Sequence, residues 1–239
     1  MSINAAELAL AAIAAVLAIT LHEAAHGFAA LAMGDDTARR AGRLSLNPLR
    51  HVDPIGTVVL PGLLVLGQLR LLGHVGFMFG WAKPVPVAAW KFRNPRRGMM
   101  VVAAAGPAMN FLLAWIGALF LPDKVSALNP LAGSFLLSFL ITNLILGLFN
   151  LIPVPPLDGG RIAVGLLPLR LAQAWARLER VGLVLVLLLV FALPPVLGNF
   201  GIDFDPIRGG LNAVLPRAWR VVLFLSGHTL EPGADEHFL

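Results

Sequence analysis

Three residues in one apolar stretch have the types and the spacing of a zinc-protease motif. His22, Glu23 and His26 lie in ITLHEAAHGF (residues 19–28), directly after a run of Ala, Leu, Ile and Val. Residues four apart share one face of a helix, so the two imidazoles can bind one metal ion. Glu23, beside the first histidine, can act as a general base on a metal-bound water. The spacing therefore predicts a hydrolytic zinc centre.

Polar packing between helices is the other interpretation of these histidines. An ionisable side chain inside a membrane span costs roughly 2.5–3.5 kcal/mol on insertion scales and is usually functional. Three such groups fall within residues 22–26. Packing alone does not readily explain three ionisable side chains in five residues, and this favours the metal site.

The third ligand of such a centre must be sought elsewhere in the chain. A catalytic zinc usually has three protein ligands and one open position for water. The chain has no Cys, so only His, Asp or Glu can serve. Asp158 lies in FNLIPVPPLDGGR (residues 149–161), in a Pro- and Gly-rich kink that follows an apolar run, and no other acidic residue lies nearby. It is the candidate ligand, and a turn aspartate before two glycines is its alternative role.

The composition is that of a membrane protein. Hydrophobic residues make up 58% of the 239 residues and charged residues only 13%, against about 25% charged in soluble domains. Three stretches of about 20 residues or more contain no charge: Gly98–Leu121, Val125–Leu157 and Val181–Ile202. Each is long enough to cross a bilayer. We therefore predict an all-α polytopic membrane protein, and no nucleic-acid partner despite the net charge of +5.

The positions of the basic residues predict how the chain threads the membrane. Residues 4–33, 98–121 and 131–152 are the expected spans of a three-helix catalytic core. His22 and Asp158 can share an ion only if an even number of crossings separates them, so one intervening apolar segment must not cross. Segment 57–80 is the weakest, and arginines and lysines fill the loops on both sides of it. The positive-inside rule then favours a re-entrant segment at 57–80, cytoplasmic loops on both sides, and an active site toward the cytoplasmic leaflet.

The rest of the chain is expected to belong to the same unit. We predict one membrane-embedded peptidase domain over residues 1–239, with its core at 4–165 and one or two further membrane helices within 166–226. Pro194 and Pro195 should interrupt the first of these. Within the loops, RLSL (residues 43–46) could form a short strand, and the tail 227–239 is expected to be disordered.

Several separate motifs resemble the site-2 protease family of intramembrane zinc metalloproteases (M50 type). HEAAH in the first span and NLIPVPPLDGG (residues 150–160) carry the resemblance, together with four shorter matches: GRLSLNPLRHVDPIGT, GWAKPVPV, AGPAMN and NLILGLFN. They fall in the order of the short bacterial and archaeal branch that lacks a PDZ domain. One departure is Ala88, where this branch is expected to have Asn, which puts one loop contact in doubt.

This resemblance implies the roles of the site residues. His22, His26 and Asp158 would be the ligands of one zinc ion per chain, Glu23 the general base, and Asn150 a residue that binds the substrate backbone or the oxyanion. The substrate would be a transmembrane protein or peptide, cut within or near its membrane helix. The enzyme would be a multi-pass protein of the cell (inner) membrane, surrounded by the lipid bilayer.

Three other functions are compatible with a histidine pair in a membrane. A metal transporter would need polar residues in series across the bilayer, whereas the polar cluster here lies at one depth. An inactive scaffold would not need Glu23 together with a full ligand set. A zinc enzyme acting on lipid or on a small molecule can be separated from a protease only by a substrate test.

Overall fold

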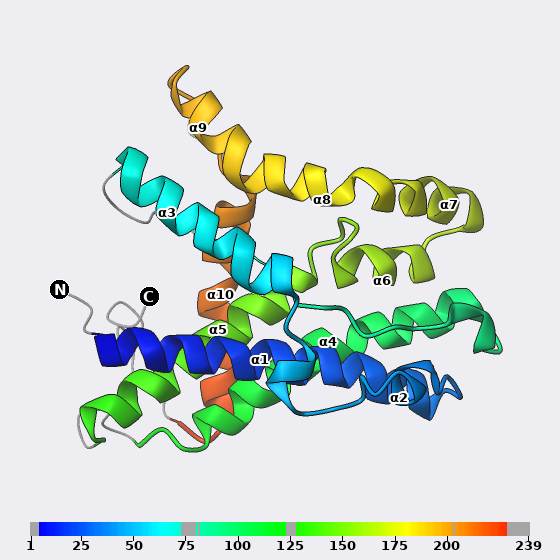
Figure 1. Ribbon diagram of the computed structural model, residues 1–239, viewed down its shortest axis with the longest axis horizontal. Coiled ribbons are helices and arrows are strands. Elements are labelled where there is room, and N and C mark those ends of the chain that lie inside the picture. Colours follow the sequence, from blue (N-terminus) through cyan, green and yellow to red (C-terminus); the bar gives the residue numbers. More distant parts are fainter. Residues whose placement is uncertain (1–4, 73–79, 81, 123–127, 203, 229–239) are drawn as a thin grey trace.

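The computed structural model describes residues 5–72, 80, 82–122, 128–202 and 204–228 (Figure 1). Its described part contains helices and loops but no strand, so the all-α class is confirmed and the strand expected at residues 43–46 is wrong. The shorter elements are α2 (Thr37–Arg40), η1 (Pro48–Arg50), η2 (Pro54–Val59), η3 (Ala89–Lys91), α6 (Asp158–Leu166) and α7 (Leu169–Arg177). The remaining elements include four helices that are long and apolar enough to cross a membrane.

Three long helices pack against one another in the centre of the molecule: α1 (Ala5–Ala32), α4 (Pro95–Ala118) and α5 (Pro130–Asn150). Their contact faces are mostly small residues that are almost fully buried, among them Ala14, Ala18, Ala114 and Ala118. Lipid leaves no hydrophobic force between membrane helices, so close packing must hold them together. Small side chains permit that close approach. The opposite faces expose large apolar residues such as Ile13 and Leu112, which suit contact with lipid.

A fourth helix is also long and apolar enough to span a bilayer. It runs from Glu179 to Gly198 as α8 (Glu179–Leu187), a π-helical stretch (Leu188–Ala192) and α9 (Leu193–Gly198). The expected interruption at Pro194 and Pro195 is therefore wrong. The two prolines occupy the first turn of α9, where proline is tolerated, and the wider π-helical turn precedes them.

The last helix, α10 (Pro206–Leu225), packs against α5 and α4. Trp219 and Val222 on it are buried in a cluster with Leu140 and Leu144. The second half of α10 is therefore a packed part of the helix bundle. The following His228 contacts the carbonyl oxygen of Leu121 through Nε2 at 2.8 Å. The rest of the predicted disordered tail, residues 229–239, lies outside the described residues.

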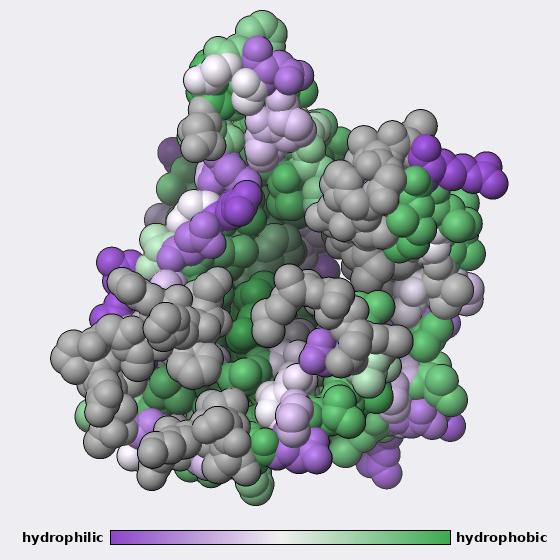
Figure 2. Space-filling model, turned by 90° about the vertical axis from the view of Figure 1, so that its left-hand side faces the viewer, coloured by the Kyte–Doolittle hydropathy of each residue, from purple (hydrophilic) through white to green (hydrophobic). Residues whose placement is uncertain are grey.

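Helix α3 (Leu60–Leu72) stands apart from the core. Among the described elements its main contact is with η2, and Leu63 and Leu66 are about 60% exposed. With its 13 residues it is shorter than a span. Figure 2 shows the surface hollowed between α3 and α9, with hydrophobic residues exposed in the hollow. The predicted re-entrant segment thus includes a short helix, while residues 73–79 and 81 lie outside the described part.

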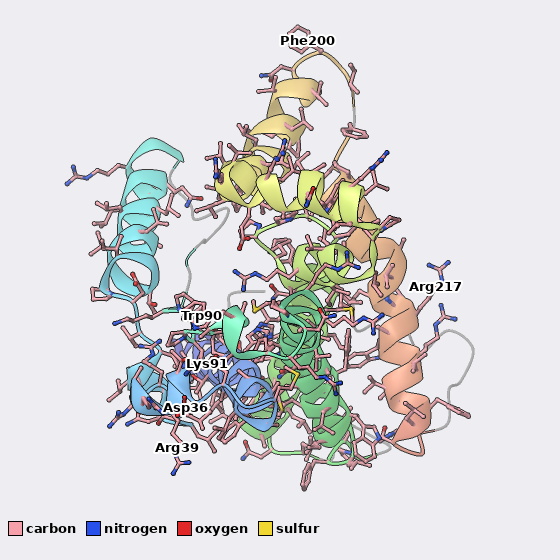
Figure 3. The ribbon with its side chains drawn as sticks, turned by 90° about the vertical axis from the view of Figure 1, so that its right-hand side faces the viewer. Asp36, Arg39, Trp90, Lys91, Phe200 and Arg217 are labelled. Atoms are coloured by element: carbon pink, nitrogen blue, oxygen red, sulfur yellow. The ribbon has the colours of Figure 1, made fainter. Side chains whose placement is uncertain are left out.

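Polar contacts join the two basic loops that precede and follow this segment. Lys91 Nζ lies 2.7 Å from Asp36 Oδ1, and both residues lie at the end of the molecule seen in Figure 3. Arg43 donates a hydrogen bond to the Lys83 carbonyl at 2.6 Å. Loops 37–56 and 82–97 therefore meet at one end of the molecule, as a re-entrant segment between them requires.

The absence of cysteine allows a direct test of this topology. Leu49, Trp90 and Phe120 are at least 70% exposed, and each can be changed to a single Cys in a chain that has none. We expect a membrane-impermeant thiol reagent to label Leu49→Cys and Trp90→Cys from one side and Phe120→Cys from the other, because only α4 crosses between residues 90 and 120. Labelling of Leu49→Cys and Trp90→Cys from opposite sides would contradict the re-entrant segment.

Candidate metal centre

The two histidines and Asp158 meet at one point between α1 and α6. His22 and His26 lie one turn apart on α1, with their Nε2 atoms separated by 3.1 Å. Asp158, the first residue of α6, places Oδ2 at 3.2 Å from Nε2 of His22 and at 3.4 Å from Nε2 of His26. His22 and Asp158 are both more than 90% buried. Residues 136 positions apart in the sequence thus form one cluster.

The outer nitrogen of each histidine faces an acceptor. His26 Nδ1 lies 2.7 Å from the carbonyl oxygen of Val102, and His22 Nδ1 lies 2.6 Å from Oδ1 of Asn110. A carbonyl oxygen can only accept, so Nδ1 carries the proton in each neutral ring. Both Nε2 atoms then present lone pairs toward each other and toward the carboxylate.

This arrangement fits a bound cation. Three acceptor atoms 3.1–3.4 Å apart repel one another unless a positive charge lies between them. Asp158 Oδ2 is buried and has no hydrogen-bond partner, as expected for an oxygen reserved for a metal. A tetrahedral zinc site with bonds of about 2.0–2.1 Å separates its ligand atoms by about 3.3 Å. The donor set and its spacing are those of a zinc ligand triad.

Glu23 lies beside this triad but is held differently. Its carboxylate and the ring nitrogens of His22 and His26 offer ligand atoms within 4.8 Å of one another. Glu23 could thus be a ligand in place of Asp158. However, Glu23 Oε2 already accepts a hydrogen bond from the Val85 backbone at 3.1 Å. This contact favours Asp158 as the ligand and leaves Glu23 next to the site, where a general base is needed.

Gly106 of α4 gives the two rings their space, a role that the sequence analysis did not identify. A Cβ atom at Gly106 would lie 2.5 Å from His26 Cε1 and 2.6 Å from His22 Cε1. Gly106 stands between Val102 and Asn110 at intervals of four, so all three face the histidines from one side of α4. The sequence signal was present in AGPAMN, as a glycine and an asparagine four apart in a span.

Substitution of Gly106 by alanine is expected to disturb the centre strongly. The added methyl group overlaps both rings, and the helices must shift to admit it, at a cost of about 1–3 kcal/mol. We expect the affinity for zinc to fall by at least about 10-fold and the melting temperature to decrease. Gly117→Ala on the same helix is the matched control, because its Cβ would meet side chains only at 3.4 Å. Zinc binding of Gly106→Ala equal to that of Gly117→Ala would contradict this account.

The turn before Asp158 is packed tightly by its neighbours. A Cβ at Gly159 would lie 2.2 Å from the Leu151 carbonyl oxygen, and one at Gly182 of α8 would lie 2.0 Å from the Pro155 carbonyl oxygen. Trp175 of α7 donates from Nε1 to the Pro153 carbonyl at 2.9 Å. The C-terminal helices α7 and α8 therefore support the segment that presents Asp158, rather than forming a separate appendage.

The segment that contacts Glu23 is fastened by a buried aspartate. Asp35, just past the end of α1, accepts a hydrogen bond from the Ala88 backbone at 2.6 Å and lies 3.2 Å from Lys91 Nζ. Burial raises the pKa of Asp35, but hydrogen bonds from Thr37, Ala88 and Lys91 outweigh it and lower the pKa to about 2. Ala88, the departure from the family pattern, thus makes its loop contact through the backbone.

The Asp35 fastening predicts a pH-dependent contribution to stability. The pKa in the folded state, about 2, is below the ordinary 3.8, so the contribution is complete above pH 4 and disappears as the pH falls toward 2. Asp35→Asn should lower the free energy of unfolding by on the order of 2 kcal/mol at neutral pH. Thermal unfolding in detergent should give a difference from wild type that shrinks between pH 4 and pH 2. Asp36→Asn, at the partly exposed neighbour, should show a much smaller difference, and an equal one would contradict the proposed role of Asp35.

Asn150, the predicted substrate-binding residue, and two loop residues make their hydrogen bonds outside the triad. Asn150 ends α5 and donates from Nδ2 to the Leu146 carbonyl at 3.0 Å, a contact within its own helix. His51 is buried and faces the Ser45 carbonyl at 2.8 Å, and Asp53 caps η2. Asn110, which contacts His22, also bonds across helices to Asn143 at 2.9 Å.

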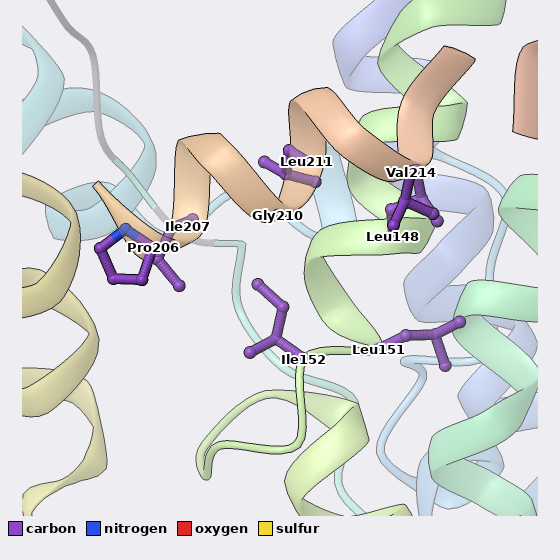
Figure 4. Close-up of a pocket in the computed structure, with 8 residues that line it drawn as sticks. All are labelled: Leu148, Leu151, Ile152, Pro206, Ile207, Gly210, Leu211 and Val214. Atoms are coloured by element: carbon purple, nitrogen blue, oxygen red, sulfur yellow. The ribbon is translucent and has the colours of Figure 1, made fainter. Parts of the chain in front are cut away.

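A cavity of about 390 Å³ opens between the end of α5 and α10. Leu148, Leu151 and Ile152 line one side and residues of α10 the other (Figure 4). All eight lining residues are apolar or glycine: Leu148, Leu151, Ile152, Pro206, Ile207, Gly210, Leu211 and Val214. This cavity has no group for chemistry, and the metal centre remains the candidate active site.

Comparisons with known proteins find similarity to metallopeptidases. The chain matches Peptidase family M50 over residues 123–193. It is 37% identical over 207 residues to "Putative zinc metalloprotease YwhC" of Bacillus subtilis, a match that covers 84% of this chain and 86% of YwhC. It is 31% identical over 220 residues to "Putative zinc metalloprotease Rip2" of Mycobacterium tuberculosis, covering 86% of this chain and 79% of Rip2. No solved structure matches significantly. The matches to YwhC and Rip2 each cover more than four fifths of this chain, so the similarity is not limited to the HEAAH motif.

Proposed function

The chain belongs to peptidase family M50 and is a zinc metalloprotease with several helices able to span a membrane, and on this premise we propose that it cuts other membrane proteins within or near their membrane helices. His22, His26 and Asp158 hold one zinc ion per chain, and Glu23 is the general base. The observation that carries the proposal is the convergence of three acceptor atoms at 3.1–3.4 Å, one of them a buried oxygen without a partner.

In the proposed reaction the metal site activates water and Glu23 transfers the proton. Zinc in such a site acts as a Lewis acid, which makes water a stronger nucleophile and polarises the peptide carbonyl. Glu23 takes a proton from the attacking water while the new C–O bond forms. It then passes that proton to the amide nitrogen as the C–N bond breaks. The hydrogen bond from Val85 to Glu23 at 3.1 Å keeps the carboxylate beside the histidines during both transfers.

A substrate helix must unwind before its peptide bonds can react, because helical hydrogen bonds shield them. The hollow between α3 and α9 (Figure 2) is a suitable approach for such a helix from the lipid. Asn150, at the end of α5 and eight residues before Asp158, would then bind the unwound backbone or the oxyanion. Substrates with Gly or Pro near the scissile bond should be cut faster than uninterrupted helices.

The same proposal places the protein in the cell membrane. The basic loops 37–56 and 82–97 would be cytoplasmic by the positive-inside rule, and the zinc site would lie toward the cytoplasmic leaflet. Residues 1–239 would act as a single domain, which the packing of α7, α8 and α10 against the core segments supports.

Cleavage of a defined peptide in lipid nanodiscs tests this function. The peptide has one transmembrane helix with a central Gly-Pro pair, and a matched peptide has Leu-Leu instead. We expect mass spectrometry to find new termini inside the helix, faster for the Gly-Pro peptide. A chelator should stop the reaction and equimolar zinc restore it. Cuts confined to the soluble ends, or cleavage indifferent to the chelator, would contradict the proposal.

A further inference from the structure

We propose that Asn143 and Asn110 form a hydrogen-bonded relay that fixes which ring nitrogen of His22 carries the proton, and thereby holds Nε2 ready for the metal. The inference rests on the proposed zinc site and adds two positioning residues to it. Neither asparagine touches the metal position itself. They act on it through the outer nitrogen of one ligand.

The relay starts at a backbone carbonyl of α5. Asn143 Nδ2 donates to the carbonyl oxygen of Phe139 at 2.8 Å. Because this oxygen can only accept, it must face the amino group of Asn143 rather than its oxygen. The orientation of the Asn143 amide is therefore determined, with Oδ1 directed away from Phe139.

The next link transfers this orientation to α4. Asn143 Oδ1 accepts from Nδ2 of Asn110 at 2.9 Å. The Asn110 amide must therefore turn its other end, Oδ1, toward His22 Nδ1, which lies 2.6 Å away. An oxygen at this position requires a hydrogen on Nδ1. Asn110 Nδ2 also lies 3.5 Å from the Ala18 carbonyl oxygen, a longer contact that favours the same orientation. The shorter contact, to Asn143, links the proton of His22 to a carbonyl on a different helix through two side chains.

Burial prevents water from substituting for either asparagine in the relay. Asn110 and Asn143 are both 0% exposed, so water cannot replace a lost partner, and an unsatisfied buried polar group costs about 1–3 kcal/mol. If Asn110 flipped, its amino group would face Nδ1, and the proton of a neutral His22 ring would move to Nε2, where it would block the metal. A metal-binding histidine is typically held by its second nitrogen in this way.

The other histidine supplies an internal comparison. His26 Nδ1 faces the Val102 carbonyl directly at 2.7 Å, so its proton needs no relay. Only His22 depends on side chains. If the asparagines served merely to bond α4 to α5, their removal would lower stability without changing how His22 binds the metal.

Zinc affinity across a double-mutant cycle separates the two cases. The affinity is measured by competition with a chromophoric chelator for purified wild type, Asn110→Leu, Asn143→Leu and the double variant. We expect Asn110→Leu to weaken zinc binding by about 10–100-fold and Asn143→Leu by about 10-fold. In the Asn110→Leu background, Asn143→Leu should change the affinity by less than about twofold, since the relay is already broken.

A conservative variant tests orientation independently of packing. Asn110→Asp places an acceptor oxygen toward His22 whichever way its carboxylate turns. Its other oxygen would face Asn143 Oδ1, which is also an acceptor, so Asn110→Asp is tested together with Asn143→Leu. In the Asn110→Asp background, Asn143→Leu should not weaken zinc binding, and Asn110→Asp/Asn143→Leu should bind zinc more tightly than Asn110→Leu/Asn143→Leu. Nitrogen-15 NMR of labelled histidine should report a proton on Nδ1 of His22 in zinc-free wild type and a shift toward Nε2 in Asn143→Leu.

The outcomes distinguish this inference from the proposed function. If wild type binds zinc and Asn143→Leu binds it with the same affinity, the relay alone is overturned. The same holds if Asn143→Leu weakens binding equally in all three backgrounds, or if the His22 proton stays on Nδ1 in Asn143→Leu. Wild type that is folded and binds no zinc overturns the metal site and the relay together.

Discussion

Alanine at Asp158 is expected to abolish stable zinc binding. The substitution removes one of three ligands and leaves two histidines on a single helix, which hold zinc weakly without a third donor. We expect the affinity to fall by more than about 100-fold, because loss of a direct ligand should exceed the 10–100-fold effect of residues behind the ligands. Metal content by mass spectrometry should decrease from one zinc per chain to nearly none, and peptide cleavage should disappear with it.

The control for this experiment is another aspartate at the start of a helix. Asp205 caps α10, with its side chain accepting from the Arg208 backbone, and Asp205→Ala should keep its zinc. One zinc per chain retained in Asp158→Ala would show that the contact between α1 and α6 is not the metal site. Glu23 would then be the better candidate for the third ligand, since it too lies within ligand distance of the histidines.

Glutamine at Glu23 is expected to separate chemistry from metal binding. The amide keeps the size of the side chain but cannot take a proton, so the cleavage rate should fall by about 10²–10⁴. Zinc content should stay at one per chain, because Asp158 and the histidines are untouched. Rates are measured with the Gly-Pro peptide in nanodiscs at saturating substrate.

Glu7→Gln is the matched control, since Glu7 lies in the first turn of the same helix α1. It should retain both zinc and cleavage. If Glu23→Gln lost its zinc, Glu23 would be a ligand. If it retained full activity, another group would have to be the base.

Local patterns in the sequence predicted the histidine pair well. HEAAH needs only one helix to bring His22 and His26 together, and α1 spans Ala5–Ala32 where residues 4–33 were expected. Asp158 was a candidate because few acidic residues are available nearby, and the resemblance to the site-2 protease family implied its role as a ligand. The geometry places it beside both histidines.

The contacts around the site could not be predicted in the same way. Asn110 lies 88 residues from His22, and Val85 lies 62 residues from Glu23, so only the packing of separate helices and loops determines them. Gly106 carries no chemistry that a motif could reveal, since its contribution is the absence of a side chain. The helix through Pro194 was missed because a π-helical turn before a proline pair has no clear sequence pattern.

The order of the ligands along the chain has a consequence for the timing of activity. His22 and His26 enter the membrane with the first span, but Asp158 becomes available only after α4 and α5 have been inserted. Metal binding is coupled to completed structure, so with these three residues as ligands a nascent chain would hold no working protease while other proteins are being inserted beside it. Once formed, the site links the first helix to residues beyond the third long one. On the proposed ligand set, zinc would stabilise the assembled helix bundle, and catalysis would begin only after assembly.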